Sequence, residues 1–315
     1  MSAPVSIGLD AGGTQTRWAA VNAQGSLCAE GEVAPISGLM LTDPSKRPQL
    51  QLALRELAEA LAPIGPVAAL YGGITGVAEP EGPVAQALNQ ALAEALQVPV
   101  QRVACHSDMD IAYRAAFAPG AGHLVYAGTG AIAVHLDAAG TLHRAGGRGY
   151  LLGDEGGGYW IAREALALLW RREDEQPGQW QGSPLARAVF ARLGGADWAR
   201  SRQFVYGGDR GAIGRLALAV AEAATEDPDA RALLRRAGTE LARLARILAQ
   251  RHGAKPVLAA GRVLLLHPLV LDGLREALPP SLPVRSGQLQ AHTTAAQLAH
   301  QLAHQLAHQS LFPKP

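Results

Sequence analysis

"VSIGLDAGGTQTRWAAVNAQGSLCAEGEV", residues 5–33, alternates apolar and polar side chains on both sides of a glycine pair. The alternation predicts strands at 5–10, 16–22 and 26–33, and "AQG" between the last two is typical of a turn. Adjacent glycines after a strand let the backbone turn tightly and bring several N–H groups toward one ligand. This stretch therefore predicts a β-hairpin with a loop suited to phosphate.

A second stretch repeats this plan: "HLVYAGTGAIAVHLDAAGTLHRAGG", residues 123–147, predicts strands at 123–127, 131–136 and 141–145 around the loop 128–130. The two copies share their turns, "VNAQGSL" and "LDAAGTL". An internal repeat of this kind predicts two related α/β domains with a ligand cleft between them. We place the domains at 1–117 and 118–288, followed by a C-terminal helix and tail at 289–315.

The loop 128–130 also begins a match to the dinucleotide-binding fingerprint G-x-G-x-x-[GA]. That fingerprint needs a helix to start at the loop, whereas the residues that follow alternate like a strand. The pattern between and after the hairpins predicts helices at 49–65, 82–96, 158–171, 183–193, 211–226, 229–252 and 264–278, and further strands at 67–77 and 255–261.

Composition restricts the classes of partner. The 315 residues carry a net charge of only +1, whereas nucleic-acid-binding proteins usually carry a strong excess of positive charge. The two cysteines, Cys28 and Cys105, give no disulfide framework or metal-binding spacing. There is no G-K-[ST] motif, no signal-peptide pattern and no long apolar run. We expect a cytoplasmic protein with small-molecule partners, bound to neither nucleic acid nor membrane.

Carboxylates stand beside the predicted loops. Asp10 precedes the first glycine pair, where it could organise Mg²⁺ through water next to phosphates held by the loop. Asp108 and Asp110 follow a short apolar stretch at the start of a helical pattern, where we expect one to cap the helix and one to act as a base. Asp154 and Glu155 lie in "GGRGYLLGDEGGG", whose seven glycines indicate close backbone approach to a ligand.

The tail "AAQLAHQLAHQLAHQ" has a period of four, which predicts a helix with leucines on one stripe and His300, His304 and His308 on another. The histidines have the i, i+4 spacing of metal ligands. Because no acidic or cysteine partner is near in sequence, the pattern favours a solvent-exposed helix face.

The ordered motifs "GLDAGGTQTR", "GGITG", "HSDMDIAYRAAF", "AGTGAIA", "GGRGYLLGDEGGGYW" and "VLAAGRVLLLHP" resemble the BadF/BadG/BcrA/BcrD ATPase family, particularly its N-acetylglucosamine kinase members, over residues 5–275. The resemblance implies a two-domain actin-like ATPase fold with a duplicated ribonuclease H-like motif, ATP and Mg²⁺ in the cleft, and a homodimer. The candidate site residues are Asp108 as catalytic base; Gly12, Gly13, Thr14, Thr16, Gly128, Thr129, Gly130 and Gly261 for ATP; Thr75, Gly147, Arg148, Gly149 and Asp154 for the sugar; and Asp10 for the metal.

The implied reaction is phosphorylation of a hexosamine-type sugar by ATP, at O6 of N-acetylglucosamine or glucosamine. The alternative is a nucleotide-dependent switch or sugar sensor of the same fold that phosphorylates no sugar. The family's dehydratase-activator branch needs a cysteine-held cluster, and the two cysteines do not match its positions. Arg148 stands where the family's sugar kinases usually carry an aromatic residue, and Gly157 where they carry Ser. A guanidinium pairs with carboxylates, which favours a more acidic amino sugar.

Overall fold

The computed structural model describes residues 3–311, which form two compact units. Unit 1 comprises the described residues up to Ala116 together with those from Leu289 onward, and unit 2 runs from Phe117 to Gln288. Residues 312–315 of the predicted tail lie outside the described part of the chain. Each unit is built around one five-stranded sheet, so the mixed α/β class expected from the sequence is confirmed.

The two sheets have the same strand order, β3-β2-β1-β4-β5 in unit 1 and β8-β7-β6-β9-β10 in unit 2. The first three strands of each are antiparallel neighbours, and the last two add in parallel. The duplication predicted from the repeated hairpins is therefore confirmed. The strands are β1 (Val5–Ala11), β2 (Thr16–Val21), β3 (Leu27–Val33), β4 (Val67–Ile74), β5 (Val103–Ser107), β6 (His123–Ala127), β7 (Ala131–Leu136), β8 (Leu142–Gly146), β9 (Val257–Ala260) and β10 (Val284–Ser286).

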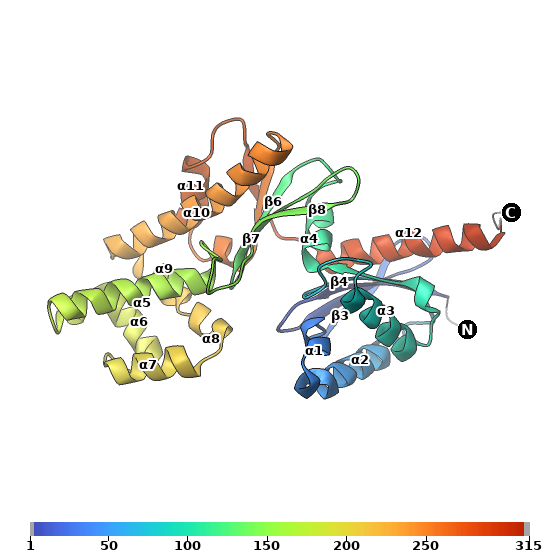
Figure 1. Ribbon diagram of the computed structural model, residues 1–315, viewed down its shortest axis with the longest axis horizontal. Coiled ribbons are helices and arrows are strands. Elements are labelled where there is room, and N and C mark those ends of the chain that lie inside the picture. The colour runs from blue at the N-terminus through green and yellow to red at the C-terminus, as the bar shows by residue number, and fades with distance from the viewer. Residues whose placement is uncertain (1–2, 312–315) are drawn as a thin grey trace. The chain divides into compact units, whose positions relative to one another are not determined.

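Helices cover both faces of the unit 1 sheet (Figure 1). The α2 and α3 leucines pack with Ile7 and Leu9 of β1, while α4 and α12 cover the opposite face, where Ala19 and Val21 of β2 meet Ala296. This arrangement follows from the strand period of two, which sends alternate side chains to opposite faces. The helices of unit 1 are α1 (Leu39–Thr42), α2 (Arg47–Leu61), α3 (Pro83–Leu96), α4 (Asp108–Ala116) and α12 (Ala291–Leu311), with 3₁₀ turns η1 (Pro44–Lys46) and η2 (Val100–Arg102).

Gly8 lets α12 pack directly on the sheet. A Cβ at this position of β1 would overlap backbone atoms of His292, Ala295 and Ala296 in α12. Because the overlap is with backbone rather than with a flexible side chain, no other residue fits without moving the helix. The C-terminal helix is thus part of unit 1.

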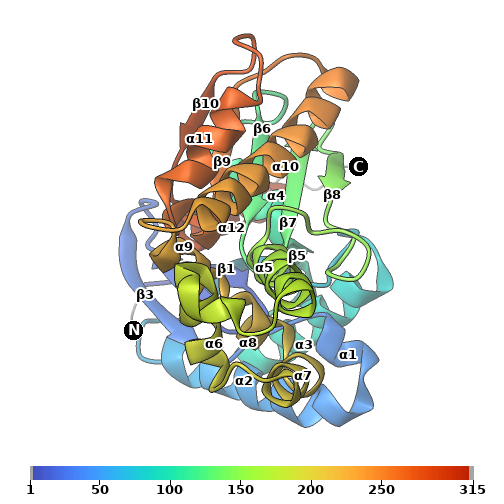
Figure 2. The same ribbon diagram turned by 90° about the vertical axis from the view of Figure 1, so that its left-hand side faces the viewer.

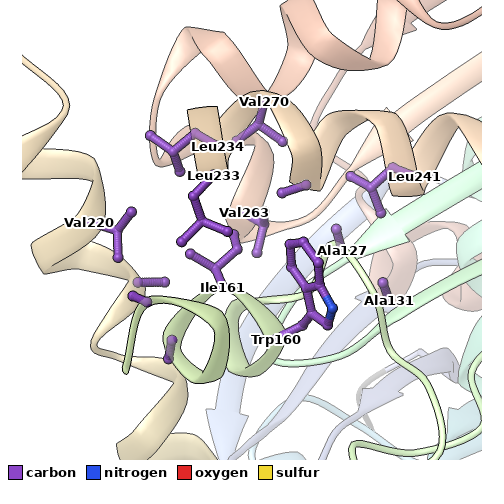
Figure 3. Close-up of a cluster of buried hydrophobic side chains, with 14 of the residues drawn as sticks. Ala127, Ala131, Trp160, Ile161, Val220, Leu233, Leu234, Leu241, Val263 and Val270 are labelled. Atoms are coloured by element: carbon purple, nitrogen blue, oxygen red, sulfur yellow. The ribbon is translucent and has the colours of Figure 1, made fainter. Parts of the chain in front are cut away.

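In unit 2, α10 lies across β6, β7 and β8, with α11 beside it (Figure 2). Figure 3 shows Trp160 and Ile161 of α5 facing leucines of α10 in the core. The helices of unit 2 are α5 (Gly158–Glu175), α6 (Pro184–Leu193), α7 (Trp198–Gly207), α8 (Arg210–Gly214), α9 (Ala217–Ala223), α10 (Pro228–His252) and α11 (Pro268–Glu276), with 3₁₀ turns η3 (Gln179–Gly182) and η4 (Arg262–Leu265).

Three elements of unit 2 differ from the sequence prediction. The helix expected at 211–226 is two helices, α8 and α9, separated by a turn at Arg215 and Leu216. Helix α7 was not predicted, since it buries only Ser201 and so carries no apolar period. Strand β10 is three residues long and largely exposed, which leaves no alternation to detect.

Candidate active site in two parts

The loop between β1 and β2 has free backbone donors. It is closed by the Gly12 N–H, which donates to the Gln15 carbonyl at 3.1 Å. The N–H groups of Gly13 and Thr14 donate to no other residue within 3–311, and both residues are exposed. Backbone donors of this kind suit the oxygens of a phosphate.

Thr16 is placed differently from the rest of this loop. It is fully buried, and its hydroxyl accepts a 2.8 Å hydrogen bond from the Ile36 N–H. This contact joins β2 to the segment that follows β3. It also satisfies the buried Thr16 hydroxyl with a protein partner, so no ligand is needed to explain why a polar side chain is buried here.

Asp10 stands at the end of β1, half-buried below the loop. Burial raises the pKa of its carboxyl above the ordinary range, and the negative charge of Asp108 raises it further, against the opposing charges of His292 and Arg17. Two neighbouring carboxylates that repel each other are stabilised by a cation between them or beside them. The donor set fits Mg²⁺, which binds through one or two carboxylates, several waters and substrate phosphates. Within residues 3–311 no three His, Cys, Asp or Glu side chains gather around one ion position, so no all-protein metal cage is present there.

Asp108 is held in a fixed orientation where β5 ends and α4 begins. Its Oδ2 accepts a 2.6 Å hydrogen bond from the Thr75 hydroxyl, and its Oδ1 accepts the N–H of Met109 at 2.9 Å. Thr75 is in turn fixed by its own N–H, which donates to the Ala11 carbonyl at 2.9 Å. The end of β1, the turn after β4 and the end of β5 thus meet at one half-exposed carboxylate.

Asp110 has a different environment, although it lies only two residues further on. Its side chain is 7% exposed, and its Oδ1 accepts the Arg114 Nε–H at 2.6 Å. A buried carboxylate paired with a cation is already satisfied. Of the two aspartates that the sequence left as candidate bases, Asp108 is the one whose carboxylate remains accessible.

The second loop, between β6 and β7, is braced by the start of α5. The carbonyls of Gly128 and Thr129 accept the N–H groups of Gly158 and Tyr159, each at 2.9 Å. A Cβ at Gly157 would lie 2.7 Å from the carbonyl carbon of Gly130, so this position has no room for a side chain. The departure from Ser at Gly157 therefore has a steric cause in this chain.

Asp154 joins the glycine-rich stretch to this second loop. A non-glycine residue at φ 62°, it is buried, and the backbone of Gly149 and of Ala131 lies beside its carboxylate. Burial raises the pKa of this carboxyl, and the charge of Arg210, whose Nη1 lies 3.9 Å from Oδ2, opposes the rise. A Cβ at Gly130 would lie 2.8 Å from the Asp154 Cγ, so the loop passes directly over the carboxylate.

Sequence reasoning missed Arg210, the cation that faces Asp154. It lies at the start of α8, in a glycine-rich segment far along the chain, where no period links it to the carboxylate. Gly147 and Gly149 adopt left-handed φ values of 62° and 85°, and Arg148 between them is exposed. The backbone here therefore turns sharply enough to require glycine.

Gly261 brings a third segment to the loop of unit 2. It follows β9 with φ 103°, and a Cβ there would lie 2.7 Å from the carbonyl carbon of Ala127, the residue before the loop. The candidate ATP residues of unit 2, which are far apart in sequence, are thus neighbours.

The family model of the BadF/BadG/BcrA/BcrD ATPase family matches residues 7–279. A search of curated proteins found no match. Among solved structures, a proposed N-acetylglucosamine kinase from Chromobacterium violaceum is 27% identical, with a TM-score of 0.71 over 95% of this chain and 100% of that one.

Two further structures share the fold. A proposed N-acetylglucosamine kinase from Porphyromonas gingivalis is 19% identical, with a TM-score of 0.71 over 94% of this chain and 99% of that one. A ROK family glucokinase from Streptomyces griseus, solved with glucose and AMPPNP, is 19% identical, with a TM-score of 0.57 over 96% and 99% of the two chains. No helix within residues 3–311 has both the length and the apolar character needed to cross a bilayer.

Proposed function

Because this chain belongs to the BadF/BadG/BcrA/BcrD ATPase family, we propose that it is an ATP-dependent sugar kinase acting on O6 of N-acetylglucosamine or glucosamine. The observation that carries the proposal is the accessible carboxylate of Asp108, which follows β5. The Thr75 hydroxyl, from the turn after β4, orients this carboxylate. Asp110, by contrast, is buried and paired with Arg114. The amino-sugar substrate rests on the similarity to the Chromobacterium violaceum protein.

In the proposed reaction, Asp108 accepts the proton of the sugar hydroxyl while the hydroxyl oxygen bonds to the γ-phosphorus and the bond from phosphorus to the ADP oxygen breaks. An ionised carboxylate offers about four lone-pair positions. The hydrogen bonds from the Thr75 hydroxyl, the Met109 N–H and, at 3.3 Å, the Ser107 hydroxyl leave one position for the substrate hydroxyl. General-base assistance of this kind contributes about 10²–10⁴-fold to the rate.

The phosphates of ATP are assigned to backbone donors. Gly13 and Thr14 of unit 1 and Thr129 and Gly130 of unit 2 supply N–H groups that donate to no other residue within 3–311. Within each unit, such donors suit the oxygens of a phosphate, and stabilising phosphate charge is the main task in phosphoryl transfer. Asp10 would hold Mg²⁺ through water, and the ion when bound supplies charge neutralisation at the phosphates. We assign the adenosine to the turn at Gly261.

The sugar is assigned to Asp154 and the backbone of Gly147 and Gly149. The assignment of Asp154 rests on the family resemblance, since its carboxylate is buried against the second loop with the Arg210 Nη1 at 3.9 Å. Arg148 is exposed between the two glycines, and no carboxylate within residues 3–311 forms an ion pair with it, so its guanidinium is free to pair with an acidic substituent on the sugar.

The test is ADP release by the purified full chain over a panel of sugars: N-acetylglucosamine, glucosamine, glucose and glucuronate, with a sugar-free control. We expect release only when an amino sugar is present, and a 6-phosphate product by ³¹P NMR. ADP release at the same rate without sugar would show an ATPase switch instead and would overturn the kinase proposal.

A further inference from the structure

The outer surface of α12 carries a histidine series that the proposed kinase reaction does not use. The helix buries its alanines, Ala291, Ala295, Ala296 and Ala299, against unit 1. His300 is partly exposed and His304 is exposed, one helical turn further on. Side chains four residues apart on a helix lie on the same face.

The two imidazoles meet through the atoms that bind metals. The Nε2 atoms of His300 and His304 are 3.2 Å apart, with ring centroids at 4.4 Å and planes at 89°. If each nitrogen bonds an ion at about 2.05 Å, as in Zn²⁺ sites, a 3.2 Å separation subtends about 100° at the ion. This angle lies between the values for square and tetrahedral coordination. We propose that His300 and His304 form a chelating site for a divalent transition-metal ion.

The ligand type selects the class of ion. Neutral imidazole suits Zn²⁺, Ni²⁺ and Cu²⁺, whereas Mg²⁺ and Ca²⁺ require oxygen ligands. Within the described residues no third His, Cys, Asp or Glu completes a cluster at one position. The ion therefore keeps positions open to water or to an external ligand, and affinity should follow the general order in which Cu²⁺ exceeds Ni²⁺ and Zn²⁺.

The neighbouring hairpin leaves this position accessible. Gly25 in the turn between β2 and β3 faces His300: a Cβ there would lie 3.5 Å from Cδ2 and 3.6 Å from Nε2. Gly25 has φ 73°, a conformation that favours glycine, so no side chain covers the imidazole from this side. The site lies where α12 meets the hairpin, and a bound ion would bridge one turn of α12.

Without metal, the same contact is a hydrogen bond in which one imidazole donates its Nε2–H to the Nε2 of the other. When an ion binds, the Nε2 lone pairs of both rings point to it, and the ring that donated the hydrogen bond carries its proton on Nδ1 instead. The hydrogen bond and the chelate use the same atoms, and titration with metal distinguishes them.

The experiment uses the full chain without an affinity tag, titrated calorimetrically with Cu²⁺, Ni²⁺ and Zn²⁺ chlorides. His304→Gln removes both i, i+4 pairs of the series and His300→Gln removes the pair in contact. His308→Gln is the matched control, because it removes an exposed histidine and keeps that pair. Gln already alternates with His in this helix, so each variant should keep the fold, which far-ultraviolet circular dichroism checks.

We expect His304→Gln and His300→Gln to weaken Cu²⁺ binding at least about tenfold, since a chelating pair gains its affinity from the second ligand. His308→Gln should bind as the unchanged chain does. The histidines elsewhere in the chain contribute the same background to every variant. Equal binding by all three variants, or an equal loss in His308→Gln, would overturn the assignment. Kinase activity is not a readout, so the outcome is independent of the proposed function.

Discussion

Replacing Asp108 by Asn tests the proposed base directly. Asparagine has the same shape, and its oxygen can still accept the Met109 N–H that now reaches Oδ1. Its NH₂ group would face the Thr75 hydroxyl, which can turn to accept instead of donating. Both contacts survive, so the free energy of unfolding should change by less than about 1.5 kcal/mol.

The catalytic loss should be much larger, because an amide cannot take the hydroxyl proton. Removing general-base assistance costs about 10²–10⁴-fold in kcat. At 1.36 kcal/mol for each factor of ten, this is about 2.7–5.4 kcal/mol of transition-state stabilisation. The assay is ADP release at saturating ATP and sugar, with nucleotide binding measured separately by fluorescence to show that the ATP residues still function.

Asp110→Asn is the matched control, since it makes the same chemical change two residues away. It removes the charge that faces Arg114, so we expect a stability loss of about 1–3 kcal/mol with kcat within a few-fold of the unchanged chain. If Asp108→Asn kept more than a tenth of kcat, or if Asp110→Asn lost more turnover than Asp108→Asn, the assignment of the base would be wrong.

Two further predictions concern unit 2. Gly130→Ala should lower the melting temperature more than Gly128→Ala, because its Cβ would lie 2.8 Å from the Asp154 Cγ, whereas the Gly128 Cβ would meet only an ordinary contact at 3.7 Å; equal shifts would contradict the steric argument. Burial holds the pKa of His123 and His252 below the ordinary value of about 6.5. Below that pH the unfolded chain therefore binds more protons than the folded chain. The free energy of unfolding should fall as the solution is acidified. His252→Gln should flatten the fall in melting temperature between about pH 7 and pH 5, and an unchanged slope would count against this cause.

The hairpins and their loops could be predicted from the sequence because two short-range signals coincide there. Alternation fixes the strands, and glycine marks the turns, so β6 and β7 occupy the residues expected. The break between α8 and α9 was missed because the apolar period continues across it, although Gly211 and Gly214 lower the helix propensity there.

Some features of the candidate site could likewise be predicted from the sequence, and others could not. The position of Asp108 at a strand end could be predicted, since an apolar run ends just before it. The choice between Asp108 and Asp110 required the contact with Arg114, and the partner of Asp154 required the fold of the segment around Arg210. Charge partners across the chain leave no periodic trace in the sequence.

Helix α12 also constrains how the chain is made. The ribosome produces α4, which ends at Ala116, long before α12, which begins at Ala291. At about 5–20 residues per second, translation of the intervening segment takes roughly 10–35 s. During that time the face of the first sheet around Gly8, Ala19 and Val21 has no cover. The nascent chain therefore exposes an apolar, aggregation-prone sheet face until α12 emerges from the ribosome. A chaperone that binds exposed apolar surface would protect the chain at that stage.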